Sequence, residues 1–288
     1  MARTMDQTMR RSALDAAAVA RVVHEALAED VGSGDLTTNA LFPPHARARA
    51  RLLLEEPGVV CGLPVAEAVF RALDPDVRFE AVVDEGDHLR RADQVAVVDG
   101  SARAVLSAER TALNLLGRLS GVATMARAFV DAVAGAGAAV LDTRKTTPGL
   151  RVLEKYATSV GGATNHRRGL HDGILVKDNH LALSAEVRTV VEKLRSVPGD
   201  HPVEVEVESL EEVRAALEAG ADALLLDNMS LGAMKEAVAL AGPRVTLEAS
   251  GGVSLASVRA VAETGVDYIS VGALTHAARS LDVSMEVQ

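Results

Sequence analysis

The chain lacks most of the features that mark disulfide-bonded, nucleic-acid-binding and membrane proteins. Cys61 is the only cysteine among 288 residues, which excludes an intrachain disulfide and a zinc site built from several thiolates. Aromatic residues make up 2% of the chain, tryptophan is absent, and the formal net charge is −10. Nucleic-acid-binding proteins usually carry a basic surface with stacking aromatics, so a small-molecule partner fits this composition better. No apolar run approaches the roughly 20 residues that a membrane helix requires.

What is present indicates a globular protein of the cytoplasm. The apolar content is 48%, enough for a large core in one barrel-sized domain or in one such domain with a smaller partner. The N-terminal segment offers only a short apolar run, Ala16 to Ala20, so we expect no signal peptide. Charged residues surround that run: Arg3, Asp6, Arg10, Arg11, Asp15 and Arg21.

From about residue 139 onward, short β-branched runs alternate with amphipathic helical stretches at intervals of roughly 20 residues. This rhythm is typical of a parallel α/β sheet or barrel. A helix over 209–219 should begin with a capping-box pair, Ser209 and Glu212. We predict six strands, with a seventh left unplaced, at 139–143, 173–178, 203–208, 223–227, 245–249 and 268–271.

The preceding part of the chain has a different pattern, which indicates an α+β arrangement. Asp99-Gly100 lies between two strand-like runs and is a hairpin signal. A long helix over 107–134, broken near Gly121, should join the two parts. The other predicted elements are helices over 13–29 and 63–73, and strands over 48–55, 77–83, 94–98 and 102–106.

One short stretch of this acidic protein, from Asp142 to His180, is rich in cationic side chains. Several of them directly follow apolar strand-like runs, and α/β proteins bind ligands at such strand ends. We therefore predict an anion site; the alternative is a solvated basic face. The cations are Arg144, Lys145, Lys155, His166, Arg167, Arg168 and Lys177.

The predicted strand Val203-Glu-Val-Glu-Val-Glu208 places three valines on one face and three glutamates on the other. Because helices must cover the valines, the glutamates should point toward the barrel axis. Inward carboxylates are costly to desolvate unless cations neutralise them, and Lys145, Lys177 and Mg²⁺ are the candidates. Asp227, at the end of the next strand, could add a further oxygen ligand for Mg²⁺. An exposed edge strand with charged outer residues is the alternative.

The last two predicted strands end in small residues. Turns of this kind let backbone N–H groups approach a phosphate at the start of a helix. The loops after the last two strands of an α/β barrel are also its usual phosphate site. The residues are Ser250, Gly251 and Gly252 after one strand and Gly272 and Ala273 after the other.

Nine ordered motifs make the chain resemble the quinolinate phosphoribosyltransferase family of type II phosphoribosyltransferases, nearly from end to end. A small departure is Ala163, where a third glycine is usual after Gly162. The motifs are EDVGSGDLTT (29–38), AERTALNLLGRLSG (108–121), DTRKTTPGLR (142–151), NHRRGLHD (165–172), VKDNH (176–180), EVEVES (204–209), LLLDN (224–228), EASGG (248–252) and YISVGALTH (268–276).

The resemblance implies an α/β fold: an open seven-stranded α/β barrel with an N-terminal α+β sandwich domain. The sandwich would cover residues 1–112, joined by the C-terminal tail 280–288, and the barrel residues 113–279. The implied reaction joins quinolinate to 5-phosphoribosyl-1-pyrophosphate and yields nicotinate mononucleotide, pyrophosphate and CO₂. The family pairs head to tail in a dimer, and we leave a higher oligomer open.

The resemblance also implies roles for particular residues. Arg144, His166, Arg167 and Lys177 are similar to the family's quinolinate-binding set, with Arg110 contributed across the dimer interface. Lys145, Glu206 and Asp227 are similar to the catalytic residues at the ribose and pyrophosphate. The two acids would bind Mg²⁺ directly or through water. The 5′-phosphate cradle would consist of Ser250, Gly251, Gly252, Val271, Gly272 and Ala273.

Two rival functions remain open at the level of sequence. A lysine at a barrel strand end, such as Lys177, could form a Schiff base as in class I aldolases. A non-catalytic relative of the same fold could instead sense or help transport a phosphate compound. The residues that would bind two carboxylates are all present. This favours quinolinate over nicotinate, whose single carboxylate would leave some of them without a partner.

Overall fold

The computed structural model describes residues 14–184, 186–199 and 201–288, and contacts within it divide the chain into two compact units. Among these residues, the parallel-sheet unit comprises Ala128–Lys145 and most of Ala163–His276, and the antiparallel-sheet unit comprises 14–127, Thr146–Gly162 and Ala277–Gln288. The domain boundary that we expected between residues 112 and 113 stays a prediction, because a division by contacts does not measure independent folding.

Six strands form the parallel sheet, at the positions that the alternating pattern predicted. Thr164 forms an isolated parallel bridge with Leu141, at the edge of the sheet where β6 (Ala139–Leu141) lies. This single bridge occupies the place of a seventh strand. The expected α/β fold with an open parallel sheet is confirmed. In spatial order the strands are β6 (Ala139–Leu141), β11 (Tyr268–Ser270), β10 (Thr246–Ser250), β9 (Ala223–Asp227), β8 (Val203–Val207) and β7 (Ile174–Val176).

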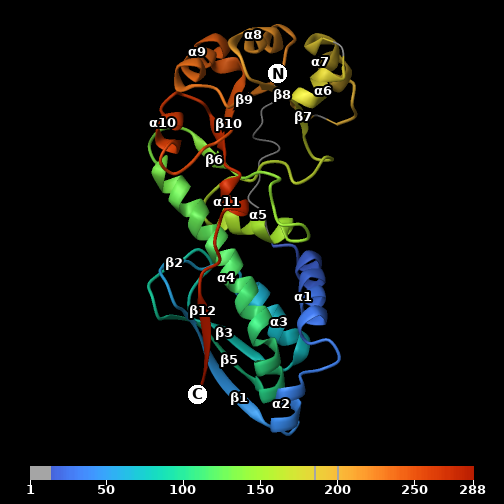
Figure 1. The fold of residues 1–288 in the computed structure, drawn as a ribbon, viewed down its shortest axis with the longest axis vertical. Coiled ribbons are helices and arrows are strands. Elements are labelled where there is room, and N and C mark those ends of the chain that lie inside the picture. Colours follow the sequence, from blue (N-terminus) through green and yellow to red (C-terminus); the bar gives the residue numbers. More distant parts are fainter. Residues whose placement is uncertain (1–13, 185, 200) are drawn as a thin grey trace. The chain divides into compact units, whose positions relative to one another are not determined.

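Short helices follow these strands. Helix α8 begins as predicted, because Ser209 accepts the N–H of Glu212, whose carboxylate in turn accepts the N–H of Glu208. Helices α8 and α9 pack against each other and against strands β8 and β10 respectively (Figure 1). The helices of this unit are α6 (Asp178–Ala182), α7 (Val187–Arg195), α8 (Leu210–Glu218), α9 (Leu231–Ala241), the 3-10 turn η2 (Gly242–Arg244), α10 (Val258–Ala262) and α11 (Ala273–His276).

Strand β8 lies inside the sheet, between β7 and β9, so the edge-strand alternative is wrong. Its inward carboxylates are buried, with Glu204 1% and Glu206 8% exposed. Glu208 is the exception to the predicted alternation. It follows the end of the strand, is exposed, and its backbone N–H takes part in capping α8. The sheet therefore carries two inward glutamates from this strand rather than three.

The antiparallel-sheet unit has its own core, centred on side chains such as Leu52, Phe70 and Leu116. Its C-terminal strand β12 pairs with β1, which places the end of the chain in this sheet. Ala13, where we expected the first helix to begin, lies outside the described residues. The four-stranded sheet has the order β12 (Val283–Val287), β1 (Arg47–Leu54), β5 (Asp93–Ser101), β3 (Arg78–Ala81), and β2 (Gly58–Val59) pairs with β4 (His88–Leu89). The helices are α1 (Ala16–Asp30), α2 (Leu36–Leu41), α3 (Leu63–Leu73), α4 (Ala102–Ala132) and α5 (Arg151–Val160).

Two predictions that rested on glycines in this region are wrong. Strand β5 continues through Asp99 and Gly100, and helix α4 follows directly, so there is no hairpin at this point. A Cβ on Gly100 would lie 2.8 Å from Val77 Cγ2. Helix α4 also continues through Gly121, where a Cβ would collide with the carbonyl oxygen of Arg279. Both glycines permit close packing rather than a turn or a break.

Within the described residues, no helix combines the length and the apolar composition needed to cross a bilayer.

Candidate active site

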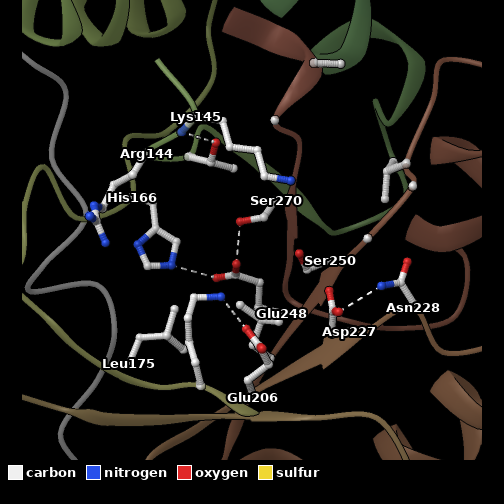
Figure 2. Close-up of a pocket in the computed structure, with 18 of the residues that line it drawn as sticks. Arg144, Lys145, His166, Leu175, Glu206, Asp227, Asn228, Glu248, Ser250 and Ser270 are labelled. Carbon is white, nitrogen blue, oxygen red and sulfur yellow. Dashed lines mark hydrogen bonds and ion pairs between the residues drawn. The ribbon is translucent and has the colours of Figure 1, made fainter. Parts of the chain in front are cut away.

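A cavity of about 670 Å³ lies at the carboxyl ends of the parallel strands (Figure 2). All the residues that line it belong to the parallel-sheet unit. Its charged side chains come from the turns after β6 and β7 and from strands β8, β9 and β10. The lining residues are Thr143, Arg144, Lys145, His166, Arg167, Leu175, Lys177, Glu206, Leu225, Asp227, Asn228, Glu248, Ser250, Gly251, Gly252, Val253, Ser270, Gly272, Ala273 and His276.

The structure brings together every predicted site residue except Arg110 and Val271. Val271 is 1% exposed and donates its N–H to the Leu141 carbonyl at 2.9 Å, so it supports the sheet rather than lining the cavity. Arg110 is an exposed residue of α4 in the antiparallel-sheet unit.

The cations of the basic stretch from Asp142 to His180 do not lie on one surface. Lys155 lies on α5 in the antiparallel-sheet unit and is 1% exposed, so its place in the predicted anion site is wrong. Arg168 is exposed and is not part of the cavity lining. Arg167, by contrast, is only 9% exposed. The solvated basic face is therefore also wrong, because the cations that line the cavity include a buried arginine.

A buried aspartate fixes the turn that carries His166 and Arg167. Asp142 is fully buried at the end of β6, where its carboxylate accepts the Asn165 amide at 2.7 Å and the His166 N–H at 2.8 Å. Arg167 Nη1 donates to the carbonyl of Gly173 at 3.1 Å. The turn is thereby tied to β6 on one side and to the approach of β7 on the other.

Arg167 is in an environment that disfavours its charge. Burial lowers the pKa of its guanidinium, and the positive charge of Arg144 lowers it further, although Glu204 opposes this effect. Two arginines held close together, one of them buried, form a site in which an anion would relieve repulsion. Guanidinium groups also match the geometry of carboxylates.

Lys177, directly after β7, forms an ion pair with Glu206 of the neighbouring strand β8, with Nζ 2.6 Å from Oε2. The sequence offers Lys145, Lys177 and Mg²⁺ as candidates to neutralise the inward glutamates. The lysine at Glu206 is Lys177, whereas Glu204 faces His166 instead. The Lys177 side chain is 46% exposed. A charged, solvated lysine is the opposite of the desolvated amine that Schiff-base chemistry favours, so the geometry does not support the aldolase alternative.

His166 lies beside two buried carboxylates, with Nε2 3.5 Å from Glu204 Oε2 and 3.3 Å from Glu248 Oε2. Burial alone would lower the pKa of the imidazole, but Glu248 and Glu204 outweigh it and raise the pKa to about 10. Burial raises the pKa of Glu204 to about 7, an effect that the charge of Glu248 reinforces. For Glu248, burial acts in the same direction, but the adjacent imidazolium outweighs it and lowers the pKa.

One contact opposes protonation of His166: the N–H of Arg167 donates to Nδ1 at 2.7 Å. Protonation of Nδ1 would break this hydrogen bond and leave the Arg167 N–H without its acceptor, at a cost of about 1–3 kcal/mol. At 3.3 Å, one carboxylate attracts the imidazolium by roughly 5 kcal/mol at an effective dielectric constant of about 20. The carboxylates therefore decide the charge, and the ring is cationic at neutral pH.

This charge should make the contribution of His166 to stability depend on pH. Its pKa rises from 6.5 to about 10 on folding, so its stabilisation is complete below pH 6.5 and lost as the pH rises toward 10. The free energy of unfolding of wild type and of His166→Gln should therefore differ more at pH 6.5 than at pH 10. Denaturant titrations at both pH values measure this difference. A difference that does not change with pH would show that the ring is neutral.

Asp227, Asn228 and the glycine turn after β10 pack closely against one another. Asp227 Oδ2 accepts the amide of Asn228 at 2.8 Å, and Asn228 has a left-handed backbone with φ +54°. Gly251 has φ +92°, and a Cβ at that position would collide with the Asn228 side chain. Only glycine allows the turn after β10 to approach Asn228, the partner of the Asp227 carboxylate, so closely.

Two groups of side chains have donors suited to a metal. His166, Glu204 and Glu248 offer ligand atoms within 4.8 Å of one another, but the cationic imidazole already neutralises the carboxylates of this group. Glu206 and Asp227 both line the cavity, at the ends of the neighbouring strands β8 and β9. Their all-oxygen donor set suits Mg²⁺ held jointly with a phosphate.

The predicted phosphate turns differ in their relation to helices. Gly272 and Ala273 lead directly into α11, a helix of four residues. A Cβ on Gly272 would lie 2.9 Å from Lys145 Cδ, so this glycine leaves room for the lysine side chain. Gly251 and Gly252 do not open a helix, because α10 begins only at Val258. The prediction of a helix start therefore fails at the first turn and holds at the second.

Sequence reasoning did not assign five polar residues of the cavity: Thr143, Asn228, Glu248, Ser270 and His276. Glu248 and Ser270 could have been found by the alternation that was applied to β8. Glu206 and Glu248 are both in register with Leu225, so the three lie in one row across the sheet. No comparable pattern marks His276, which lies on α11.

Comparison with known proteins agrees with this architecture. Models of the quinolinate phosphoribosyl transferase N-terminal and C-terminal domains match residues 35–120 and 122–286. A probable nicotinate-nucleotide pyrophosphorylase [carboxylating] from Synechocystis is 45% identical over 265 residues, which cover 91% of this chain and 90% of the relative. The corresponding protein of Mycobacterium leprae is 42% identical, with 92% and 95% covered.

Solved structures with the same fold include NadC from Streptococcus pyogenes, with a TM-score of 0.92 and 42% identity over 96% of this chain and 99% of that one. The nicotinate-nucleotide pyrophosphorylase of Francisella tularensis gives a TM-score of 0.91 at 36% identity, with 97% and 99% covered. The two domain matches together span most of the sequence, and the cavity lies within the C-terminal one. The chain therefore belongs to the quinolinate phosphoribosyltransferase family.

Proposed function

We propose that the cavity binds quinolinate and 5-phosphoribosyl-1-pyrophosphate side by side and is the site of their reaction. The chain is a phosphoribosyltransferase, a carboxylating nicotinate-nucleotide pyrophosphorylase of NAD biosynthesis. It forms nicotinate mononucleotide, pyrophosphate and CO₂. The observation that carries the placement is the grouping of the lining residues: cations, among them the buried Arg167, form one wall of the cavity, and glycine turns and carboxylates form the other.

Quinolinate is a rigid dicarboxylate, and the cation wall suits it. Arg144 comes from the turn after β6, Arg167 and the cationic ring of His166 come from the segment between α5 and β7, and Lys177 directly follows β7. A dianion placed among them would relieve the repulsion that lowers the pKa of Arg167. It would also offer Lys177 a second carboxylate besides Glu206. Nicotinate has a single carboxylate and would leave part of this wall without a partner.

The opposite wall suits the phosphoribosyl group. The turns Ser250-Gly251-Gly252 and Gly272-Ala273 present backbone without large side chains, as a 5′-phosphate requires. The Lys145 side chain crosses beside Gly272, and its backbone is anchored by Thr275, whose hydroxyl donates to the Lys145 carbonyl at 2.8 Å. Lys145 is thereby placed to stabilise the negative charge of the departing pyrophosphate.

Glu206 and Asp227 would bind a magnesium ion, either directly or through water. Both line the cavity together with the phosphate turns, so an ion bound there could also contact the pyrophosphate. When bound, Mg²⁺ would neutralise charge on the pyrophosphate leaving group. The task of the two carboxylates is to hold it at that position. Asn228 orients Asp227 by donating its side-chain amide to Oδ2.

The reaction needs no covalent nucleophile from the protein. The C1–oxygen bond of the ribose breaks and its electron pair leaves with pyrophosphate, while the pyridine nitrogen donates its lone pair to C1. The ring nitrogen is then cationic and stabilises the electron pair left on C2 when the adjacent carboxylate departs as CO₂. A proton from solvent completes C2. The protein acts by positioning the two substrates and by compensating charge.

We also propose that the functional unit is a homodimer in which Arg110 of each subunit completes the quinolinate site of the other. The support is the family's dimer and the position of Arg110, an exposed cation of α4 outside the cavity lining. The proposed partners are the two small-molecule substrates and a second copy of the chain.

Arg144→Ala and Arg167→Ala should each weaken quinolinate binding by about 2 kcal/mol, or roughly 30-fold, through loss of charge-assisted hydrogen bonds. Binding of phosphoribosyl pyrophosphate should stay largely intact, because its groups lie at the other wall. Isothermal titration with each ligand measures both effects. Arg168→Ala is the matched control, since Arg168 is an exposed neighbour outside the cavity lining. Equal losses for the two ligands would contradict this division of the cavity.

A further inference from the structure

A cluster of buried polar side chains lies beside His166 of the cation wall and is formed by Glu204 on β8, Glu248 on β10 and Ser270 on β11, of which the last two also line the cavity. Glu204 is 1% exposed, Glu248 is fully buried and Ser270 is 6% exposed. Figure 2 shows the Ser270 hydroxyl above the Glu248 carboxylate and the His166 ring to its left, each next to a different carboxylate oxygen. The proposed substrate contacts give no role to Glu248 or Ser270.

The two carboxylate oxygens of Glu248 have different contacts: one accepts a hydrogen bond, and the other has only an ionic contact. Oε1 accepts the hydroxyl of Ser270. Oε2 is buried and has no hydrogen-bond partner among the described residues, and its nearest ionic contact is Nε2 of His166 at 3.3 Å. A buried carboxylate is costly without a counter-charge, and the other neighbour, Glu204, has the same sign. The burial of Glu248 therefore depends on the imidazolium, and the charge on the imidazolium depends in turn on Glu248.

The imidazole of His166 connects Glu248 to the cation wall. Its Nε2 faces the carboxylates, while Nδ1 lies 2.7 Å from the N–H of Arg167. The ring therefore lies between the buried cluster and the backbone of the residue whose guanidinium lines the cavity. A carboxylate so close to an anion site would repel the ligand unless a cation stood between them.

We propose that Glu248, held by Ser270, is a positioning residue of the quinolinate site and acts through His166 on the turn that carries Arg167. This inference rests on the proposed function of the cavity. Glu248 fixes the orientation and the charge of His166, so that the wall presented to quinolinate keeps its positive charge. The phosphate turns do not depend on this contact.

The test compares Glu248→Gln, which keeps the shape of the side chain, with Ser270→Ala, which leaves the carboxylate but removes its hydrogen-bond donor. Glu236→Gln is the control, because Glu236 is exposed on α9. Isothermal titration gives Kd for quinolinate, and separately for phosphoribosyl pyrophosphate with Mg²⁺. Proton–carbon NMR of the histidine ring follows the titration of His166, with His166→Gln identifying its signal. The charged groups around the ring are Glu204, Glu248, Arg144 and Arg167.

Glu248→Gln should raise Kd for quinolinate about tenfold or more, through loss of a charge-assisted contact, and should change Kd for phosphoribosyl pyrophosphate less than about twofold. It should also lower the pH at which His166 loses its proton. Ser270→Ala should move both quantities in the same direction by a smaller amount, and Glu236→Gln should move neither.

Unchanged quinolinate binding by Glu248→Gln would overturn the proposal. So would equal losses for the two ligands in both Glu248→Gln and Ser270→Ala, because that pattern indicates a role only in folding. A wild-type protein that binds no quinolinate would instead refute the proposed function. The shift of the His166 titration would in that case still report whether Glu248 controls the ring.

Discussion

Asp227→Ala should lower the turnover number by about 100-fold or more, because the substitution removes a group assigned to the metal and the leaving group. KM for quinolinate should change little, since Asp227 lies at the opposite wall from the arginines. Steady-state kinetics with saturating Mg²⁺ separates the two parameters. Asp227 lies at the end of β9 and is not fully buried, so the melting temperature should stay close to that of wild type.

Two further variants sharpen this test. Glu206→Ala should also lower the turnover number, but it additionally removes the partner of Lys177 and should therefore disturb quinolinate binding as well. Asp76→Ala, at an exposed position of the antiparallel-sheet unit, should behave as wild type. An unchanged turnover number in Asp227→Ala would remove this residue from the catalytic site.

Homodimers of Arg110→Ala and of Lys145→Ala should each be nearly inactive, yet mixing them should restore activity. If Arg110 acts across the interface, a mixed dimer contains one site with both substitutions and one site with neither. Random exchange makes half of the dimers mixed, and half of their sites are intact. The expected recovery is therefore roughly a quarter of wild-type activity by closed two-fold symmetry.

The alternative predicts a different result from the same mixture. If Arg110 served the cavity of its own subunit, every site would keep one substitution and no activity would return. Subunit exchange is verified by mass spectrometry of differently tagged chains. Exchanged samples that stay as inactive as the two homodimers would refute the shared site and the dimer as the functional unit.

The parallel sheet could be predicted because its signal is repeated. Six β-branched runs at regular intervals indicated six strands, and the structure has each of them within a few residues of the predicted bounds. The cavity followed from the same pattern, since cations and glycines directly after strands share one edge of a parallel sheet. Lys177 after β7 and Gly251 after β10 are examples.

Packing between distant segments could not be predicted in the same way. Gly100 and Gly121 resemble turn and break signals in sequence, but each allows a close approach by residues far along the chain. Lys155 lies in the sequence among the cations of the site, yet it is buried in the other unit. Local sequence does not show which segment will pack against a given residue.

The charge pattern inside the sheet could be predicted only in part. Alternation along β8 indicated that Glu204 and Glu206 face inward, and both are buried. It did not show that His166, rather than Lys145, would compensate Glu204, because that depends on how the segment between α5 and β7 folds around Asp142. The magnesium ion, the dimer and the cytoplasmic location stay predictions.

The most direct test of the central claim uses quinolinate labelled in the carboxylate next to the ring nitrogen. With phosphoribosyl pyrophosphate and Mg²⁺, the protein should release labelled CO₂ and form nicotinate mononucleotide in equal amounts. Omission of phosphoribosyl pyrophosphate or addition of excess EDTA should abolish both products. Failure to release CO₂ under the complete conditions would contradict the account, and full turnover in EDTA would contradict the role assigned to Glu206 and Asp227.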